Sequence, residues 1–142
     1  AGLQRELALM NARALGQRFT QAAIGQSGPA ALIAVAQAYR AYIKESPGVY
    51  LASLRSSGAQ QPVDAELSAA EEPSLRVALA VIASFGLTGN DALHAARGLR
   101  SLVHGFATLE IAGGFGLPLD LDESFDRLLQ MFVHALQAGQ TS

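Results

Sequence analysis

The chain has 142 residues, of which half are apolar and only 15% are charged, and its formal net charge is −2. This length suits a single domain, and the ten Lys and Arg residues are too few to indicate direct binding to nucleic acid by this chain. The absence of cysteine excludes a disulfide scaffold, thiolate metal sites and cysteine nucleophiles. The apolar fraction is high for a small monomer, so we expect a large core or an apolar surface covered by a second copy or a ligand. The longest apolar run, residues 30–36, is too short to span a membrane.

Three helices are predicted in the first part of the chain, each ended by glycine or proline. The first covers residues 3–24, where apolar residues recur at steps of three and four. The second follows Ser27, a candidate N-cap with Pro29 in the first turn, and reaches residue 45. Apolar side chains cover most of its circumference, so we expect it to be central. The third is a short helix over residues 47–55.

The middle of the chain breaks this pattern. Residues 56–62 are polar and contain glycine, and residues 63–72 are acidic and weakly periodic. We therefore expect a loop with at most one helical turn before a fourth helix, which starts at Glu72–Pro73–Ser74 and runs through Phe85.

Two more helices complete the prediction. One covers residues 90–112 with Asn90 as its cap, and the other starts at residue 120 or 122, where Asp120 and Glu123 have the spacing of a capping box, and reaches residue 138. No stretch shows the alternation of a strand. The fold class is therefore all-α with about six helices.

A glycine cluster at residues 113–116 resembles a phosphate-binding loop, but it follows a helix rather than a strand and lacks a Gly-Lys-Ser/Thr ending. A helix stop explains it. The acidic residues from Asp120 onward resemble a calcium loop, but Phe125 and Met131 occupy the places of its glycine and its last glutamate, so we interpret the acids as helix caps.

The three histidines, His94, His104 and His134, form no His-Glu-x-x-His motif, so no metal or cofactor is expected. His104 lies on an apolar helix segment, where it can be a hydrogen-bonded core or interface histidine or a ligand contact. The neighbouring Thr108 and Glu110 do not form a nucleophile–base arrangement with it, so the sequence does not predict an enzyme.

The last two predicted helices carry more large apolar residues than one antiparallel contact requires. They can simply form the core, or the hairpin can also pack on a twofold-related copy as a four-helix bundle, which the apolar excess favours. The residues predicted for this dimer interface are Phe106, Leu109, Phe125, Leu128, Phe132 and Leu136.

Two stretches carry a family resemblance: LRSLVHGFATLEIAGGFGLPLDLDESFDRLL, within residues 90–136, and LIAVAQAYRAYIKESPGVY, residues 32–50. With its glycines and proline in register, the chain resembles the C-terminal effector-binding and dimerisation domain of TetR/AcrR-type transcriptional regulators. The subgroup is named for a Trp-His-Gly signature. The slot of its tryptophan lies near Arg100, and this chain has no tryptophan.

The resemblance implies a cytoplasmic regulator that is a homodimer, with the last two helices forming the dimer bundle. It also implies an N-terminal helix-turn-helix domain that reads operator DNA, and we expect that domain to be absent from this chain. No contact with a membrane is expected. The first predicted helix, residues 3–24, resembles the helix that connects that domain to the rest.

By resemblance, a pocket for a small, largely apolar effector lies among the central helices. The candidates for its lining are residues of the central helices that carry a polar group or an aromatic ring: Tyr39, Tyr42, Phe85, His104 and Thr108. The alternative function is a helical homodimeric interaction module without an effector pocket. A cavity of several hundred Å³ favours the sensor, and a solid core favours the module.

Overall fold

A computed structural model describes residues 2–56 and 64–139, and within them the chain forms six helices and no strand. The helices are α1 (Gly2–Ala23), α2 (Gly28–Glu45), α3 (Pro47–Ser56), α4 (Ala65–Ala83), α5 (Gly89–Ile111) and α6 (Leu121–Ala138). The all-α prediction is confirmed. Residues 57–62 of the predicted loop lie outside the described residues.

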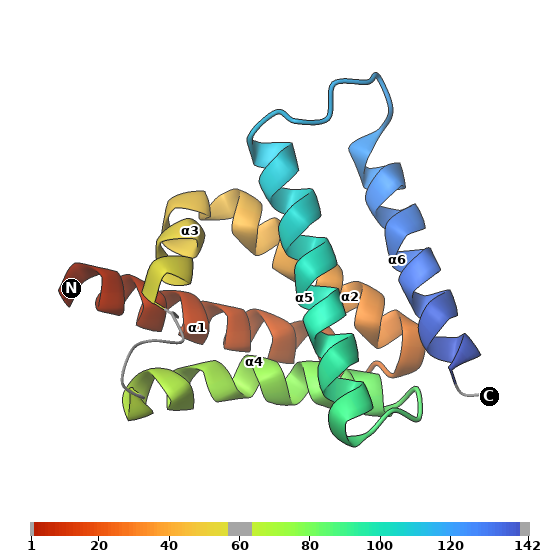
Figure 1. The fold of residues 1–142 in the computed structure, drawn as a ribbon, viewed down its shortest axis with the longest axis horizontal. Coiled ribbons are helices and arrows are strands. Elements are labelled where there is room, and N and C mark those ends of the chain that lie inside the picture. The colour runs from red at the N-terminus through yellow and green to blue at the C-terminus, as the bar shows by residue number, and fades with distance from the viewer. Residues whose placement is uncertain (1, 57–63, 140–142) are drawn as a thin grey trace.

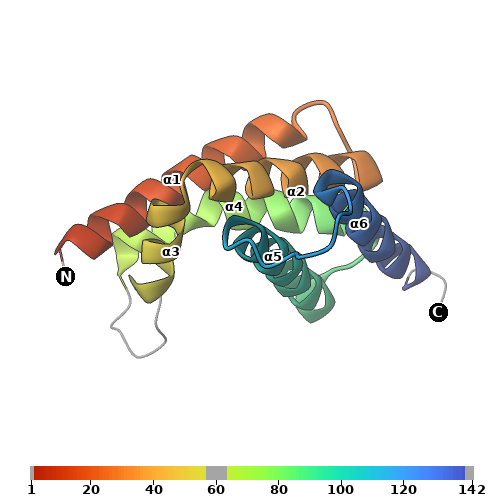
Figure 2. The same cartoon turned by 90° about the horizontal axis from the view of Figure 1, so that it is seen from above.

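The helices form two groups that cross each other. α1 and α4 run side by side, and α5 and α6 stand across them as an antiparallel pair (Figure 1). Seen from above, α5 and α6 lie on one side of the group formed by α1, α2 and α4 (Figure 2). The largest core cluster is built around α2, where Leu32, Ala36 and Ile43 are fully buried, so the predicted central place of this helix is confirmed.

The prediction for the middle of the chain is wrong. Residues 65–72 form the first two turns of α4, and Pro73 lies inside this helix rather than at its start. Asp64 caps the helix by accepting a hydrogen bond from the backbone N–H of Leu67 (3.1 Å), and Arg5 on α1 donates to the same carboxylate (2.7 Å). A cap and a partner 59 residues away thus extend a helix that its weak periodicity did not predict.

Gly16 explains how α1 and α4 approach each other at Pro73. A Cβ atom on Gly16 would lie 3.2 Å from the Cβ of Pro73, so a larger residue there would require Pro73 to move away by a few tenths of an ångström. The proline therefore lies inside α4 at a contact where α1 has no side chain.

The glycine cluster ends α5, as predicted. Gly113 has φ +70°, its N–H donates to the carbonyl of Glu110 (3.1 Å), and the N–H of Gly114 donates to the carbonyl of Leu109 (2.7 Å). These two bonds form a Schellman motif, in which a left-handed glycine satisfies the last helical carbonyls. The cluster is a helix stop and not a phosphate loop.

Two predicted caps differ in the structure. The N-cap of α5 is Thr88 and not Asn90, which lies inside the helix. Asp120 is the N-cap of α6, but its side chain makes no capping hydrogen bond, so the predicted capping box does not form. Asp122 instead forms an ion pair with Arg40 of α2.

Arg40 connects α2 to both α5 and α6. Its buried guanidinium donates two hydrogen bonds to Glu110 on α5 (2.9 and 2.8 Å) and one to Asp122 on α6 (2.8 Å). Its carbon Cζ lies 5.2 and 4.9 Å from the ring centroids of Phe106 and Phe125. A planar cation that binds a carboxylate with two parallel bonds and stacks on rings needs arginine and not lysine.

We expect Arg40→Leu to lower the free energy of unfolding by about 3 kcal/mol, because the buried carboxylate of Glu110 loses both hydrogen bonds from Arg40 and keeps only the ion pair with Lys44 (3.1 Å). Urea unfolding measures this. The control is Arg127→Leu, which breaks only an exposed pair with Glu123 and should cost about 0.5 kcal/mol. Equal effects of the two variants would show that the Arg40 cluster is not a structural anchor.

The same cluster predicts a pH dependence. The hydrogen bonds from Arg40 and then Lys44 hold the pKa of Glu110 below its ordinary value of 4.5. A carboxyl group with a lower pKa in the folded state stabilises the fold above its unfolded pKa, and this contribution is lost as the pH falls through the folded value. Stability should therefore fall below about pH 4.5.

Glu110→Gln cannot make this contribution, so its free energy of unfolding should fall less steeply with acid than that of the original chain. Urea unfolding between pH 7 and pH 3 measures the two slopes. Glu123→Gln, which removes an exposed carboxylate, is the control and should leave the slope unchanged. A slope for Glu110→Gln that equals the original would contradict the prediction.

Candidate functional site

A cavity of about 480 Å³ lies where α1, α3, α4 and α5 meet, with Tyr39 of α2 in its wall. One face of α1 forms much of the lining, with Ala8, Asn11, Leu15 and Phe19 at steps of three and four residues. The inner walls are mostly apolar. This size and composition are typical of a site for a small organic molecule.

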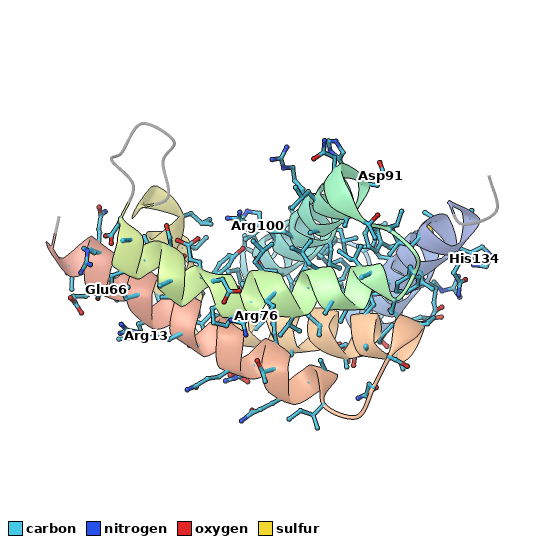
Figure 3. The ribbon with its side chains drawn as sticks, turned by 90° about the horizontal axis from the view of Figure 1, so that it is seen from below. Arg13, Glu66, Arg76, Asp91, Arg100 and His134 are labelled. Atoms are coloured by element: carbon cyan, nitrogen blue, oxygen red, sulfur yellow. The ribbon has the colours of Figure 1, made fainter. Side chains whose placement is uncertain are left out.

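Charged residues in the lining lie at the exposed rim. Glu71 and Glu72 come from α4 and Arg100 from α5. Figure 3 shows this side of the molecule, with Arg100 beside α4. Glu72 is paired with Arg76 on the next turn of α4. The cavity therefore offers charge only at its mouth.

Three side chains from three helices form a hydrogen-bonded row at the wall. The hydroxyl of Tyr50 on α3 lies 3.2 Å from the hydroxyl of Tyr39 on α2 and 2.7 Å from Nδ1 of His104 on α5. Burial, with the neighbouring Tyr39 as a smaller cause, raises the pKa of Tyr50 far above its ordinary value, so its hydroxyl stays protonated. The row links the cavity wall to α5.

The predicted pocket residues divide into two groups. Tyr39 lines the cavity, and His104 reaches its wall through the hydroxyl of Tyr50. The other three lie away from this cavity. Tyr42 packs under the guanidinium of Arg18, Phe85 is buried in the core at the end of α4, and Thr108 donates to the carbonyl of His104 (2.7 Å).

Sequence reasoning missed Asn11 and Tyr50, which both line the cavity. A signal existed for Asn11, because it is a polar residue among the small and apolar positions of α1. Tyr50 gave little signal, since its hydrogen-bond partner His104 lies 54 residues away in the chain.

The predicted dimer residues also divide. Phe106, Phe125 and Leu136 are buried in the core of this chain, and the two phenylalanines contact Arg40. These three cannot supply free surface to a second copy, because the packing of α5 and α6 on α2 covers them. Leu109 is 49% exposed, and Leu128 and Phe132 are half-buried.

A second apolar face remains on α5 and α6, which we call the outer face. On α5 it contains Gly98, Leu102, Gly105 and Leu109, and on α6 it contains Leu128, Met131, Phe132 and Ala135. These positions follow one another at helical steps beside the core stripe. A Cβ atom on Gly98 would touch the ring of Phe132 (3.4 Å), whereas one on Gly105 would meet nothing within 4 Å.

Comparison with known proteins decides the class. The sequence profile of the tetracycline repressor-like C-terminal domain matches residues 32–132. The chain belongs to this TetR family.

Two curated relatives agree with the TetR assignment. The chain is 37% identical to the HTH-type transcriptional regulator Rv0681 of Mycobacterium tuberculosis over 118 residues, which are 82% of this chain and 52% of the relative. It is 30% identical to the HTH-type transcriptional regulator YobS of Bacillus subtilis over 138 residues, or 95% of this chain and 70% of the relative. The matched region thus spans about half the length of the first relative.

Within the described part of this TetR-type chain, no helix is long and apolar enough to cross a membrane. The same residues contain no group of three or more His, Asp or Glu side chains that could hold a metal ion.

We expect Tyr50→Phe to lower the free energy of unfolding by about 1–2 kcal/mol, because it removes the hydroxyl between Tyr39 and His104. The control is Tyr42→Phe. The hydroxyl of Tyr42 has no hydrogen-bond partner among the described residues, so its loss should have little effect. Urea unfolding of both variants measures the difference, and equal costs would contradict the importance of the row.

Proposed function

We propose that the chain is the ligand-sensing and dimerisation part of a TetR-type transcriptional regulator, and that it is not an enzyme. The 480 Å³ cavity carries this proposal, because a domain that only held two copies together would not need a hollow with mostly apolar walls beside the row of Tyr39, Tyr50 and His104. The interaction module without a pocket is the less favoured function for the same reason.

The position of α1 supports a role in signalling. This helix contributes one whole face to the cavity lining, and by resemblance it connects to the DNA-reading domain. A ligand that binds better when α1 occupies one of two positions shifts the population toward that position. Operator affinity then depends on occupancy through a coupling between two sites, which is reciprocal for binding free energies.

The outer face of α5 and α6 supports dimerisation. It presents Leu109, Leu128 and Phe132, together with Met131, which is 63% exposed. Gly105 leaves open space beside them, so a helix of a second copy can approach closely. A twofold axis at this face would produce a four-helix bundle, in which each copy contributes α5 and α6.

A cavity-filling variant tests the sensor. We expect compounds from a library of small amphipathic molecules to raise the melting temperature of the original chain by several degrees, since ligand at 100 times its Kd adds about 2.7 kcal/mol. Ala78→Phe places a ring in the cavity and should abolish these shifts. Ala83→Phe, at an exposed position of the same helix, should keep them. Shifts that survive Ala78→Phe would contradict this site.

Analytical ultracentrifugation at micromolar concentration tests the dimer. We expect a species of twice the chain mass of 14.8 kDa, and a monomer for Leu109→Glu, which places a charge on the outer face. Leu51→Glu is the control, because Leu51 has a similar exposure of 42% but lies on α3. A monomeric original chain would overturn the dimer proposal.

A further inference from the structure

Arg100 is a cation of the cavity rim that has no carboxylate partner. It lies on α5, is exposed to solvent and forms part of the lining beside α4 (Figure 3). Most of the other described arginine and lysine side chains form ion pairs with carboxylates. Among the side chains that the structure describes, Arg97 and Arg100 form no such pair, and of these two only Arg100 lines the cavity.

α5 itself provides no counter-ion for Arg100. The positions three and four residues away, where a partner on the same helix would lie, are held by Ala96, Arg97, Val103 and His104. None of these side chains is a carboxylate. By contrast, Arg76 and Arg127 each pair with a glutamate four residues earlier on the same helix. The guanidinium at the cavity mouth is therefore available to an anion from outside the protein.

The positive charge of Arg100 acts on the polar row at the cavity wall. Burial raises the pKa of the Tyr50 hydroxyl, the neighbouring Tyr39 adds to this rise, and the charge of Arg100 opposes it. A cation that favours the ionised form of a phenol also favours a carboxylate placed beside it. The part of the mouth formed by α3 and α5 is therefore favourable for an anionic group.

The rim also holds two carboxylates, both on α4. Glu72 is compensated by Arg76 on the next turn, whereas Glu71 has no ion-pair partner among the described residues. An anion at the mouth is thus attracted by Arg100 and opposed by Glu71. Arg97, one turn before Arg100, adds a second unpaired positive charge on α5, so the balance favours an anion over a cation.

We propose that the effector is an amphipathic carboxylic acid, whose carboxylate binds Arg100 at the mouth of the cavity while its apolar body lies against the walls formed by α1 and α4. This inference rests on the proposed sensor function. At the rim the carboxylate keeps part of its hydration, so it avoids the large cost of burying a charge. The planar guanidinium can donate two parallel hydrogen bonds to its two oxygens.

The proposed pose has a consequence for signalling. The carboxylate is held by α5, which carries the outer face, and the apolar body contacts α1, which by resemblance leads to the DNA-reading domain. One bound molecule thus connects the two helices whose relative position the sensor would change.

A matched pair of probes tests the inference. Biphenyl-4-carboxylate carries the charge, and biphenyl-4-carboxamide has the same body and no charge. By isothermal titration calorimetry near neutral pH, we expect the original chain to bind the carboxylate roughly five to ten times more tightly than the amide. Arg100→Gln should remove this preference. Arg100→Lys, which keeps the charge without the planar pair of donors, should retain part of it.

Arg97→Gln is the matched control. It removes the other unpaired cation of α5, which lies outside the cavity lining, so most of the preference for the carboxylate should remain. Because both arginines are exposed, we expect both glutamine variants to fold, and circular dichroism checks this.

Two further measurements separate a charge effect from a loss of fit. Raising sodium chloride from about 0.05 M to about 0.5 M should reduce the preference of the original chain, because salt screens a pair at an exposed rim. Glu71→Gln removes the opposing charge, so it should tighten binding of the carboxylate and leave binding of the amide unchanged.

The outcomes separate this inference from the proposed function. Equal affinity of the original chain for carboxylate and amide overturns the role of Arg100 but leaves the sensor intact, and so does a preference that persists in Arg100→Gln. Tighter binding of the cationic probe 4-phenylbenzylamine than of the carboxylate would assign charge recognition to Glu71 and overturn the inference. No saturable binding of any probe overturns it as well, whereas the sensor is then decided by the compound library and Ala78→Phe.

Discussion

The arrangement of this domain depends on the buried guanidinium of Arg40. It joins α2 to Glu110 of α5 and Asp122 of α6, and the rings of Phe106 and Phe125 cover it. Arginine fits this position because its donors are fixed in one plane and its faces stack on aromatic rings. The cluster therefore sets the rotation of α5 and α6 on the rest of the fold, and with it which residues face the core and which face outward.

That rotation gives α5 two sides that enter the proposed function. On one side, His104 meets the hydroxyl of Tyr50 at the cavity wall, and Arg100 lies at the rim. On another, Gly105 and Leu109 belong to the outer face. A rigid helix that contacts both the proposed ligand cavity and the proposed subunit interface can couple them, because a shift at one side moves the other. The cavity and the proposed dimer interface would then be coupled through α5.

Local sequence signals predicted much of the fold and failed at one helix. Apolar periodicity gave the other five helices, and the glycines after α5 gave the stop, since both depend on neighbours within a few residues. α4 was misjudged because its first turns are held by Arg5 and by the cap at Asp64, and because Pro73 lies against Gly16 of α1. These contacts join distant parts of the chain, which periodicity does not detect.

The sequence by itself determined the class: an all-α chain with a TetR-type C-terminal pattern and an apolar excess in its last two helices. It identified Tyr39 and His104 as polar groups worth attention. Only the tertiary structure decided that Tyr50 joins them, that Asn11 is left with an unpaired acceptor, and that Phe106 and Phe125 serve the core. The reason is physical: a helical pattern shows which side of a helix is buried, whereas the packing of several helices decides what that side meets.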